Sequence, residues 1–150
     1  MEYSLALQKA ASYCSVSERC ASEVIEKLQK WGINSNDCEK IVEHLKSEKF
    51  IDEQRYCSFF VKDRFRFNLW GKNKIAYMLS VKNLPKEFIA EALEQVDYEE
   101  YIAALSAMLH SKAKSIKTID QYQKNAKLYR FAQSRGFENE AIREAVAKVI

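Results

Sequence analysis

Glycine and proline are scarce in this sequence. Its 150 residues include three Gly and one Pro, so few positions can break a helix or close a tight hairpin. No stretch that alternates apolar with polar residues and is enriched in β-branched ones is long enough to predict a strand. This scarcity excludes a β-rich protein and favours long helices joined by short polar connections.

Long apolar runs are missing as well. No run approaches the roughly 18 apolar residues that a membrane-spanning helix needs. The first residues, Met1 to Ser4, lack the basic start and apolar stretch of a signal peptide. We therefore expect a cytoplasmic protein with no membrane partner.

Residues that carry catalysis are also few. The two histidines are His44 and His110, and neither has another ligand type at a spacing that suits a metal. The sequence contains no Gly-rich phosphate loop and no nucleophile elbow. We predict no catalytic residue, no metal and no cofactor, and hence a protein that is not an enzyme. His44 is expected on an exposed helix surface.

The four cysteines form no CxxC pair, and three fall where a helical pattern would bury them. They are Cys14, Cys20, Cys38 and Cys57. We interpret them as small buried hydrophobes in a reducing compartment, with metal binding or disulfide formation as the alternatives.

What the sequence does contain is an internal repeat with a period of 51 and then 53 residues, visible when Leu28, Leu79 and Ala132 are aligned. Apolar residues then coincide in all three copies without a gap. The aligned sets are Val24, Ile75 and Leu128; Ile33, Leu84 and Phe137; Cys38, Ile89 and Ile142; Ile41, Ala92 and Ala145; Val42, Leu93 and Val146; and Leu45, Val96 and Val149. Such a period predicts repeated helix–turn–helix units.

A further amphipathic helix is expected before each unit, at about residues 3–13, 53–67 and 98–115. The prediction is therefore an all-α chain of three tandem three-helix repeats, with repeat boundaries at 1–51, 52–96 and 97–150. Because each repeat would contact mainly its neighbours, we expect one continuous, elongated and curved helical array. The alternative is a single nine-helix globule with accidental periodicity.

Several helix ends can be predicted from local signals. Four segments have the spacing of capping boxes, in which two residues satisfy each other's free amides: Ser15-x-x-Glu18, Asn36-x-x-Glu39, Asp97-x-x-Glu100 and Thr118-x-x-Gln121. Gly32 and Gly136 each follow an amphipathic run, where a left-handed residue can end a helix.

Charge is segregated although the net charge is only +3. Residues 62–82 and 110–130 each carry six cations against a single Asp, at equivalent places in the second and third repeats. The cations are Lys62, Arg64, Arg66, Lys72, Lys74 and Lys82, and then Lys112, Lys114, Lys117, Lys124, Lys127 and Arg130. The pattern predicts a basic face for nucleic-acid phosphates or an acidic protein groove, the alternative being a solvated lysine-rich surface.

Aromatic residues alternate with cations between Arg64 and Lys74, as in proteins that stack single-stranded bases and hold the backbone with cations. Phe65 has helical spacing with Phe60 and is predicted to be in the core. Trp70 lies in a predicted loop, so it is the candidate for an exposed contact.

Two stretches of this region carry a family resemblance. The first is Asp52-Glu53-x-Arg55-Tyr56-Cys57-x-x-Phe60-Val61-x-x-Arg64, and the second is Trp70-Gly71-x-x-Lys74-Ile75-x-x-x-Leu79. Together they resemble the central signature of the RecX regulatory proteins. Upstream, Ser17-Glu18 and Glu23-Val24-Ile25-x-Lys27-Leu28-x-x-Trp31-Gly32-Ile33 are similar to the family's first-repeat pattern. The resemblance covers nearly the whole chain, with Tyr56-Cys57 standing where Phe-Ala is more usual.

The resemblance implies a regulatory binding protein. RecX proteins bind the filament of the RecA recombinase on single-stranded DNA and restrain recombination, DNA repair and the SOS response, so the implied partners are that filament and single- or double-stranded DNA. We expect a monomer. The residues chosen for partner or DNA contact are Lys62, Arg64, Arg66, Trp70, Lys72 and Lys74.

The signature also implies structural roles for Asp52, Arg55, Tyr56 and Gly71. Asp52 is expected to cap a helix, and Arg55 to pair with an acidic residue of a neighbouring repeat.

An alternative function is a nucleic-acid-binding helical module that needs no recombinase, since three-helix units commonly bind DNA. Against sequence-specific reading, none of the second helices carries the Arg, Asn and Gln cluster that contacts base edges.

Overall fold

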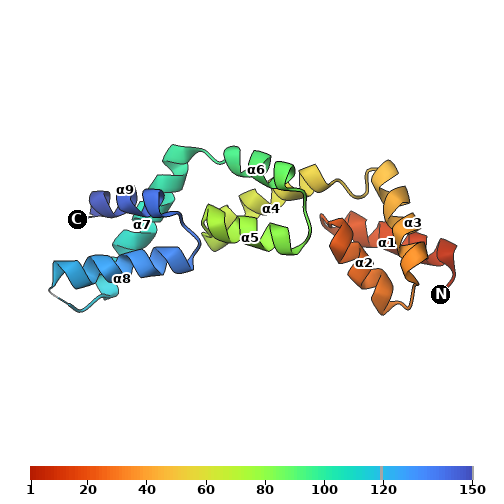
Figure 1. The fold of residues 1–150 in the computed structure, drawn as a ribbon, viewed down its shortest axis with the longest axis horizontal. Coiled ribbons are helices and arrows are strands. Elements are labelled where there is room, and N and C mark those ends of the chain that lie inside the picture. Colours follow the sequence, from red (N-terminus) through yellow and green to blue (C-terminus); the bar gives the residue numbers. More distant parts are fainter. Residues whose placement is uncertain (119, 150) are drawn as a thin grey trace. The chain divides into compact units, whose positions relative to one another are not determined.

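Every regular element is an α-helix in the computed structural model, which describes residues 1–118 and 120–149 (Figure 1). In chain order the helices are α1 (Tyr3–Val16), α2 (Ala21–Lys30), α3 (Ser35–Ser47), α4 (Glu53–Asn68), α5 (Lys72–Val81), α6 (Lys86–Glu94), α7 (Tyr98–Ser115), α8 (Gln121–Ser134) and α9 (Asn139–Val149). They confirm the predicted all-α class with three helices in each repeat. The helices expected before each helix–turn–helix are α1, α4 and α7.

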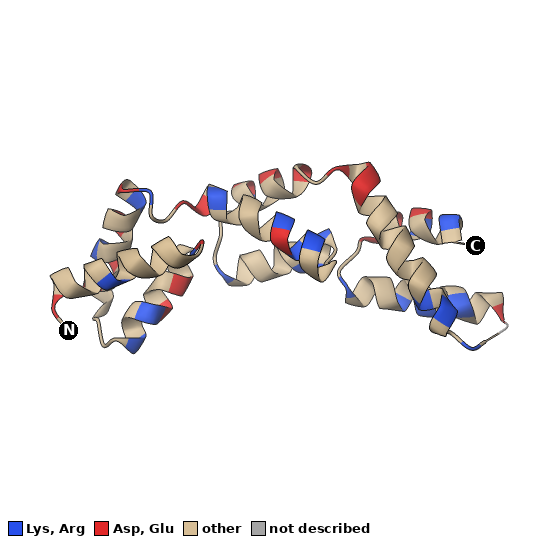
Figure 2. Cartoon of the chain, turned by 180° about the vertical axis from the view of Figure 1, so that it is seen from behind, with Lys and Arg blue, Asp and Glu red and all other residues tan. Residues whose placement is uncertain are grey.

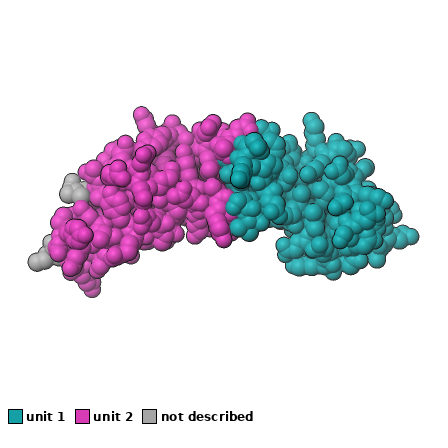
Figure 3. Space-filling model, viewed as in Figure 1, with its two compact units in different colours: residues 1–59, 79–89 teal, residues 60–78, 90–150 magenta. Residues whose placement is uncertain are grey.

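The chain forms two compact units, coloured separately in Figure 3. One contains residues 1–59 and 79–89, and the other residues 60–78 and 90–150. The second repeat therefore contributes to both units, because α4, α5 and α6 each belong partly to one and partly to the other. The repeat boundaries at 51/52 and 96/97 and the curved array stay predictions.

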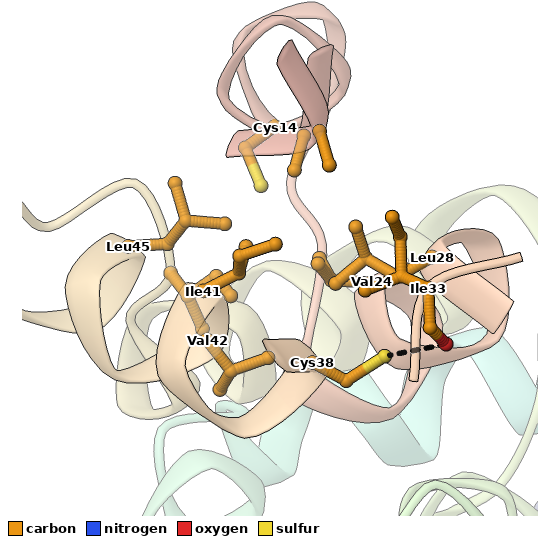
Figure 4. Close-up of a cluster of buried hydrophobic side chains, with 11 residues drawn as sticks. Cys14, Val24, Leu28, Ile33, Cys38, Ile41, Val42 and Leu45 are labelled. Carbon is orange, nitrogen blue, oxygen red and sulfur yellow. Dashed lines mark hydrogen bonds between the residues drawn. The ribbon is translucent and has the colours of Figure 1, made fainter. Parts of the chain in front are cut away.

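The first repeat has its own hydrophobic core, shown in Figure 4. Side chains of α1, α2 and α3 point toward one another there, and Leu28, Ile41 and Leu45 are fully buried. Cys38 packs among them, and its thiol donates a hydrogen bond to the Ile33 carbonyl over 3.6 Å. All four cysteines are buried with free thiols, so they pack as small hydrophobes.

The turn between the second and third helices has the same geometry in every repeat. Three backbone N–H groups donate to carbonyls five residues upstream: Ile33 to Leu28 (3.1 Å), Leu84 to Leu79 (3.2 Å) and Phe137 to Ala132 (3.1 Å). The residue just before each donor is left-handed: Gly32 (φ 80°), Asn83 (φ 63°) and Gly136 (φ 91°). This arrangement is the Schellman helix end, and it confirms the repeat alignment and both predicted glycine ends.

One of the four predicted helix starts is confirmed, and three are wrong by a few residues. Asp97 caps α7 by accepting the N–H of Glu100 over 3.0 Å. The other helices begin after a different capping residue: α2 after Cys20, α3 after Asn34 and α8 after Asp120. Ser15 instead lies within α1, one residue beyond buried Cys14. Each loop holds several residues able to cap, and packing of the apolar face decides which of them does so.

Candidate interaction surface

The α4–α5 connection folds Trp70 back onto α4. α4 ends at Asn68, Leu69 adopts a left-handed conformation (φ 54°), and the Trp70 N–H donates to the Arg64 carbonyl over 3.2 Å. The Trp70 ring then meets the Phe60 ring edge-on, with centroids 6.4 Å apart. A left-handed leucine therefore places the tryptophan.

Two cations lie over this tryptophan. The Arg64 guanidinium carbon is 5.4 Å from the Trp70 ring centroid and 4.7 Å from that of Phe60. The Lys74 Nζ, from the first turn of α5, is 4.5 Å from the Trp70 centroid. These distances suit cation–π attraction. We call Phe60, Arg64, Trp70 and Lys74 the Trp70 cluster.

The predicted aromatic roles are partly correct. Phe65 is buried, with 5% of its surface exposed, and this confirms its place in the core. Trp70 lies in the loop, as predicted, and is half-buried, so its role as a contact stays a prediction. Its backbone bond to α4 and its packing on Phe60 account for the buried part.

The structure brings together three of the six residues chosen for partner contact. Arg64, Trp70 and Lys74 share the Trp70 cluster, whereas the Lys72 Nζ lies 5.1 Å from the centroid of the Tyr101 ring. The other two, Lys62 and Arg66, line a separate hollow. Acidic residues of the third repeat, Asp97 and Glu100, line that hollow too. Lys62 and Arg66 thus face a mixed-charge environment.

Charge pairing differs within the predicted contact set. Arg64 is partly neutralised, because its Nη1 lies 2.8 Å from a carboxylate oxygen of Asp63. Lys72 and Lys74 form no ion pair with any residue that the structure describes. Their charges remain available to an anionic partner.

Gly71 lies where the start of α5 meets the turn between α8 and α9. Its N–H donates to the Arg135 carbonyl over 2.7 Å, and the Asn73 N–H donates to the Gly136 carbonyl over 2.8 Å. A Cβ on Gly71 would lie 2.4 Å from the carbonyl carbon of Gly136. A side chain at position 71 would therefore push this turn away, and the free amides at the start of α5 would lose their acceptors.

Tyr101 completes this junction. Its hydroxyl accepts the N–H of Lys72 over 2.9 Å and donates to the carboxylate of Glu138. Burial raises the pKa of Tyr101, as does its hydrogen bond to Glu138, so the hydroxyl stays protonated at neutral pH. The buried ring lies against Phe65 and Phe137, with centroids 5.5 and 5.1 Å away.

Tyr56 occupies the equivalent position at the other junction. It is the fourth residue of α4, as Tyr101 is of α7. Burial raises the pKa of Tyr56, and hydrogen bonds to Glu23 and Cys20 at the start of α2 raise it further. Each tyrosine therefore holds the start of the middle helix of the preceding repeat. The sequence signal that could have identified Tyr101 is the shared Asp-x-x-x-Tyr spacing of residues 52–56 and 97–101.

Asp52 and Arg55 have the contacts expected for their positions. Asp52 caps α4, because its Oδ1 accepts the Arg55 N–H over 2.9 Å. The Arg55 Nε lies 2.6 Å from a carboxylate oxygen of Glu18 in the first repeat, and its Nη2 donates to the Lys49 carbonyl over 3.2 Å. These contacts join the start of α4 to the first repeat.

His44 is exposed, as predicted. Within residues 1–118 and 120–149 no group of three or more His, Cys, Asp or Glu side chains could hold a metal ion. No helix in that part of the chain is both long and apolar enough to cross a membrane.

Three helix–turn–helix units, with Tyr56 and Tyr101 each bound at the start of the middle helix of the preceding repeat, define a tandem three-helix-repeat protein. Family comparisons give the same three repeats. Residues 6–45 match the first three-helix domain of RecX, residues 52–93 the second and residues 99–146 the third. The chain belongs to the RecX family of regulatory proteins.

Two curated relatives are 32% and 28% identical to this chain over the aligned residues. The regulatory protein RecX of Clostridium botulinum (strain Eklund 17B / Type B) is 32% identical over 130 residues, covering 85% of this chain and 60% of the relative. That of Prosthecochloris aestuarii (strain DSM 271 / SK 413) is 28% identical over 145 residues, covering 97% of this chain and 93% of the relative. The chain thus spans 60% of the clostridial relative and 50% of the one from Lactobacillus johnsonii (strain CNCM I-12250 / La1 / NCC 533).

A solved structure shares the fold. The crystal structure of RecX from Lactobacillus salivarius superposes with a TM-score of 0.89 at 19% identity, covering 98% of this chain and 96% of that one. The three-repeat fold is therefore common to chains that share few residues.

Proposed function

We propose that this chain regulates the RecA recombinase by binding its filament on single-stranded DNA, mainly as an inhibitor. Membership of a family of regulatory proteins supports the regulatory role. The location of the contact surface is supported by the Trp70 cluster, in which Arg64 and Lys74 lie over one half-buried ring. We further propose a cytoplasmic monomer that acts in recombination, DNA repair and the SOS response.

The Trp70 cluster suits this role because its cations are already ordered. A flexible lysine or arginine loses side-chain entropy on binding, whereas one held over a ring has lost part of it before the partner arrives. Lys72 and Lys74 lack carboxylate partners in the described part of the chain. They can therefore neutralise phosphates of the DNA or carboxylates of the recombinase, and such contacts weaken as salt is added.

A second candidate function is direct binding of single-stranded nucleic acid. The observation that favours it is the same combination of an aromatic ring and cations, which single-strand binders use for bases and backbone. The two functions differ in one requirement, since a filament regulator needs the recombinase for tight binding.

The proposal is tested by measuring ATP hydrolysis by RecA on single-stranded DNA while this protein is titrated in. The wild-type chain should inhibit hydrolysis. The variant Arg64→Gln/Lys72→Gln/Lys74→Gln should need about tenfold more protein, because close charge contacts contribute strongly to association. Neutral glutamine is preferred to a reversed charge, since Arg64 and Lys74 pack over Trp70.

The matched control removes the same number of cations from exposed positions elsewhere, as Lys40→Gln/Lys86→Gln/Arg143→Gln. It should inhibit like the wild type. An unchanged hydrolysis rate with the wild-type chain would refute the proposed function. Equal inhibition by the folded triple variant and the control would refute only the assignment of Arg64, Lys72 and Lys74 to the contact surface.

A further inference from the structure

A second surface lies along α7 and α8, beyond the Trp70 cluster. Two adjoining hollows share three residues there, Lys112, Ser115 and Phe131, and so form one continuous groove. We call it the α7–α8 groove. Figure 2 shows Lys and Arg gathered where the C-terminal end of α7 runs beside α8.

One half of the groove is apolar. Its walls are Leu69, Ala104, Ala107, Met108 and the Phe131 ring, with serines and Lys112 at the margin. Ala107 is exposed, and Leu69, Ala104 and Met108 are half-buried, so this apolar wall is open to solvent. Leu69 reaches it from a left-handed backbone conformation (φ 54°) that a branched side chain rarely adopts.

The other half of the groove is cationic. Lys112, Lys117, Lys127 and Arg130 line it together with Phe131, and among the described residues no carboxylate lines either half. None of these four cations forms an ion pair with a residue that the structure describes. Lys112 joins the two halves, because its Nζ lies 4.9 Å from the centroid of the Phe131 ring.

We propose that the α7–α8 groove binds an acidic peptide segment that carries one large apolar side chain. The apolar half would take the side chain and the cationic half the flanking carboxylates, an arrangement of one buried anchor with charges beside it. A nucleic-acid strand fits less well, because most of the apolar wall is aliphatic or thioether (Leu69, Ala104, Ala107 and Met108) and offers a base no ring on which to stack. The proposal is independent of the recombinase function.

The test uses the full chain and no recombinase. Its probe is a fluorescein-labelled peptide of about 12 residues, the length of a typical recognition segment, with a single Phe flanked by Asp and Glu. Fluorescence anisotropy should show saturable binding. Replacing the Phe of the peptide by Ala should weaken it about tenfold, since one apolar side chain then leaves its site.

Two variants of the protein assign the site. Lys127→Gln/Arg130→Gln should weaken peptide binding about tenfold, and Met108→Glu should abolish the preference for the Phe peptide over the Ala peptide. The matched control Lys40→Gln/Lys86→Gln should bind like the wild type, and circular dichroism checks the helical content of each variant. If Met108→Glu does not fold, Met108→Ala replaces it in testing the preference for the Phe peptide.

Three results would overturn the proposal. The first is that the Phe peptide does not bind, and the second is that the Lys127→Gln/Arg130→Gln variant binds it as tightly as the control does. The third is that an oligothymidylate of matched charge binds more tightly than the peptide and that Lys127→Gln/Arg130→Gln abolishes this binding. The last result would make the groove a nucleic-acid site.

Discussion

Gly32 and Gly136 share a backbone conformation but differ in their surroundings. Both are left-handed, yet a Cβ at Gly32 would meet no atom within 4 Å, whereas one at Gly136 would lie 2.3 Å from the Cβ of Lys74. Gly32→Ala should therefore cost only the conformational strain, about 1–2 kcal/mol. Gly136→Ala should cost about 1–3 kcal/mol more, because the α8–α9 turn must move away from α5.

Urea unfolding of the two glycine variants measures this difference, and each is the other's control. Equal losses of unfolding free energy would contradict the close packing of Gly136 against Lys74.

Leu79 lies at the aligned position of the second repeat and is fully buried. Leu79→Ala should lower the free energy of unfolding by about 2–5 kcal/mol, because it removes buried methyl groups and leaves a cavity. Val81→Ala, on the same helix at a position that is 59% exposed, should change it by less than about 0.5 kcal/mol. A loss below about 0.5 kcal/mol for Leu79→Ala in denaturant melts would mean that the alignment fails at this residue.

At the scale of helices, the Tyr101 hydroxyl links the start of α5 to Glu138, just before α9. Tyr101→Phe would leave the Lys72 N–H and the Glu138 carboxylate without this partner. The expected loss of unfolding free energy is about 1–3 kcal/mol, the usual cost of an unsatisfied buried polar group. Hydrogen exchange should also become faster at the start of α5, where local opening would be easier.

The control for that variant is Tyr122→Phe, on a side chain that is 83% exposed. A Tyr101→Phe protein as stable as this control, with unchanged exchange in α5, would show that the hydroxyl does not hold the junction.

Helix positions could be predicted because burial follows the spacing of apolar residues. The aligned Leu28, Leu79 and Ala132 are all fully buried. The exact first residue of each helix could not be predicted, because neighbouring polar residues such as Asn34 and Asn36 are equally able to cap a helix. The spacing shows which residues face inward, but it does not rank the caps.

The candidate site was less predictable than the helices. The Arg64–Lys74 segment could be selected by its mixture of cations and aromatics. The partial burial of Trp70, however, depends on the left-handed conformation of Leu69, which could not be predicted because position 69 is not a glycine. The Tyr101 contact with the Lys72 N–H joins residues 29 positions apart. Contacts of this range depend on how repeats pack, and local patterns do not contain that information.

At the scale of the whole molecule, the repeat pattern predicts an elongated array, because each repeat should contact mainly its neighbours. Small-angle scattering should then give a radius of gyration clearly above the roughly 15 Å expected for a compact domain of this length. A value near 15 Å would favour a single globule instead. The measurement should be made on a sample shown to be monomeric by light scattering.

The central claim is that the chain is a filament regulator, and its binding preference tests that claim most directly. Fluorescence anisotropy of the labelled protein is measured with single-stranded DNA alone, with RecA alone and with the RecA filament assembled on the same DNA. Tight binding should require the filament, and it should weaken steeply with added salt because the contacts are ionic. Equally tight binding to the DNA without RecA, or no gain from the filament, would contradict the account and leave a direct nucleic-acid-binding module in its place.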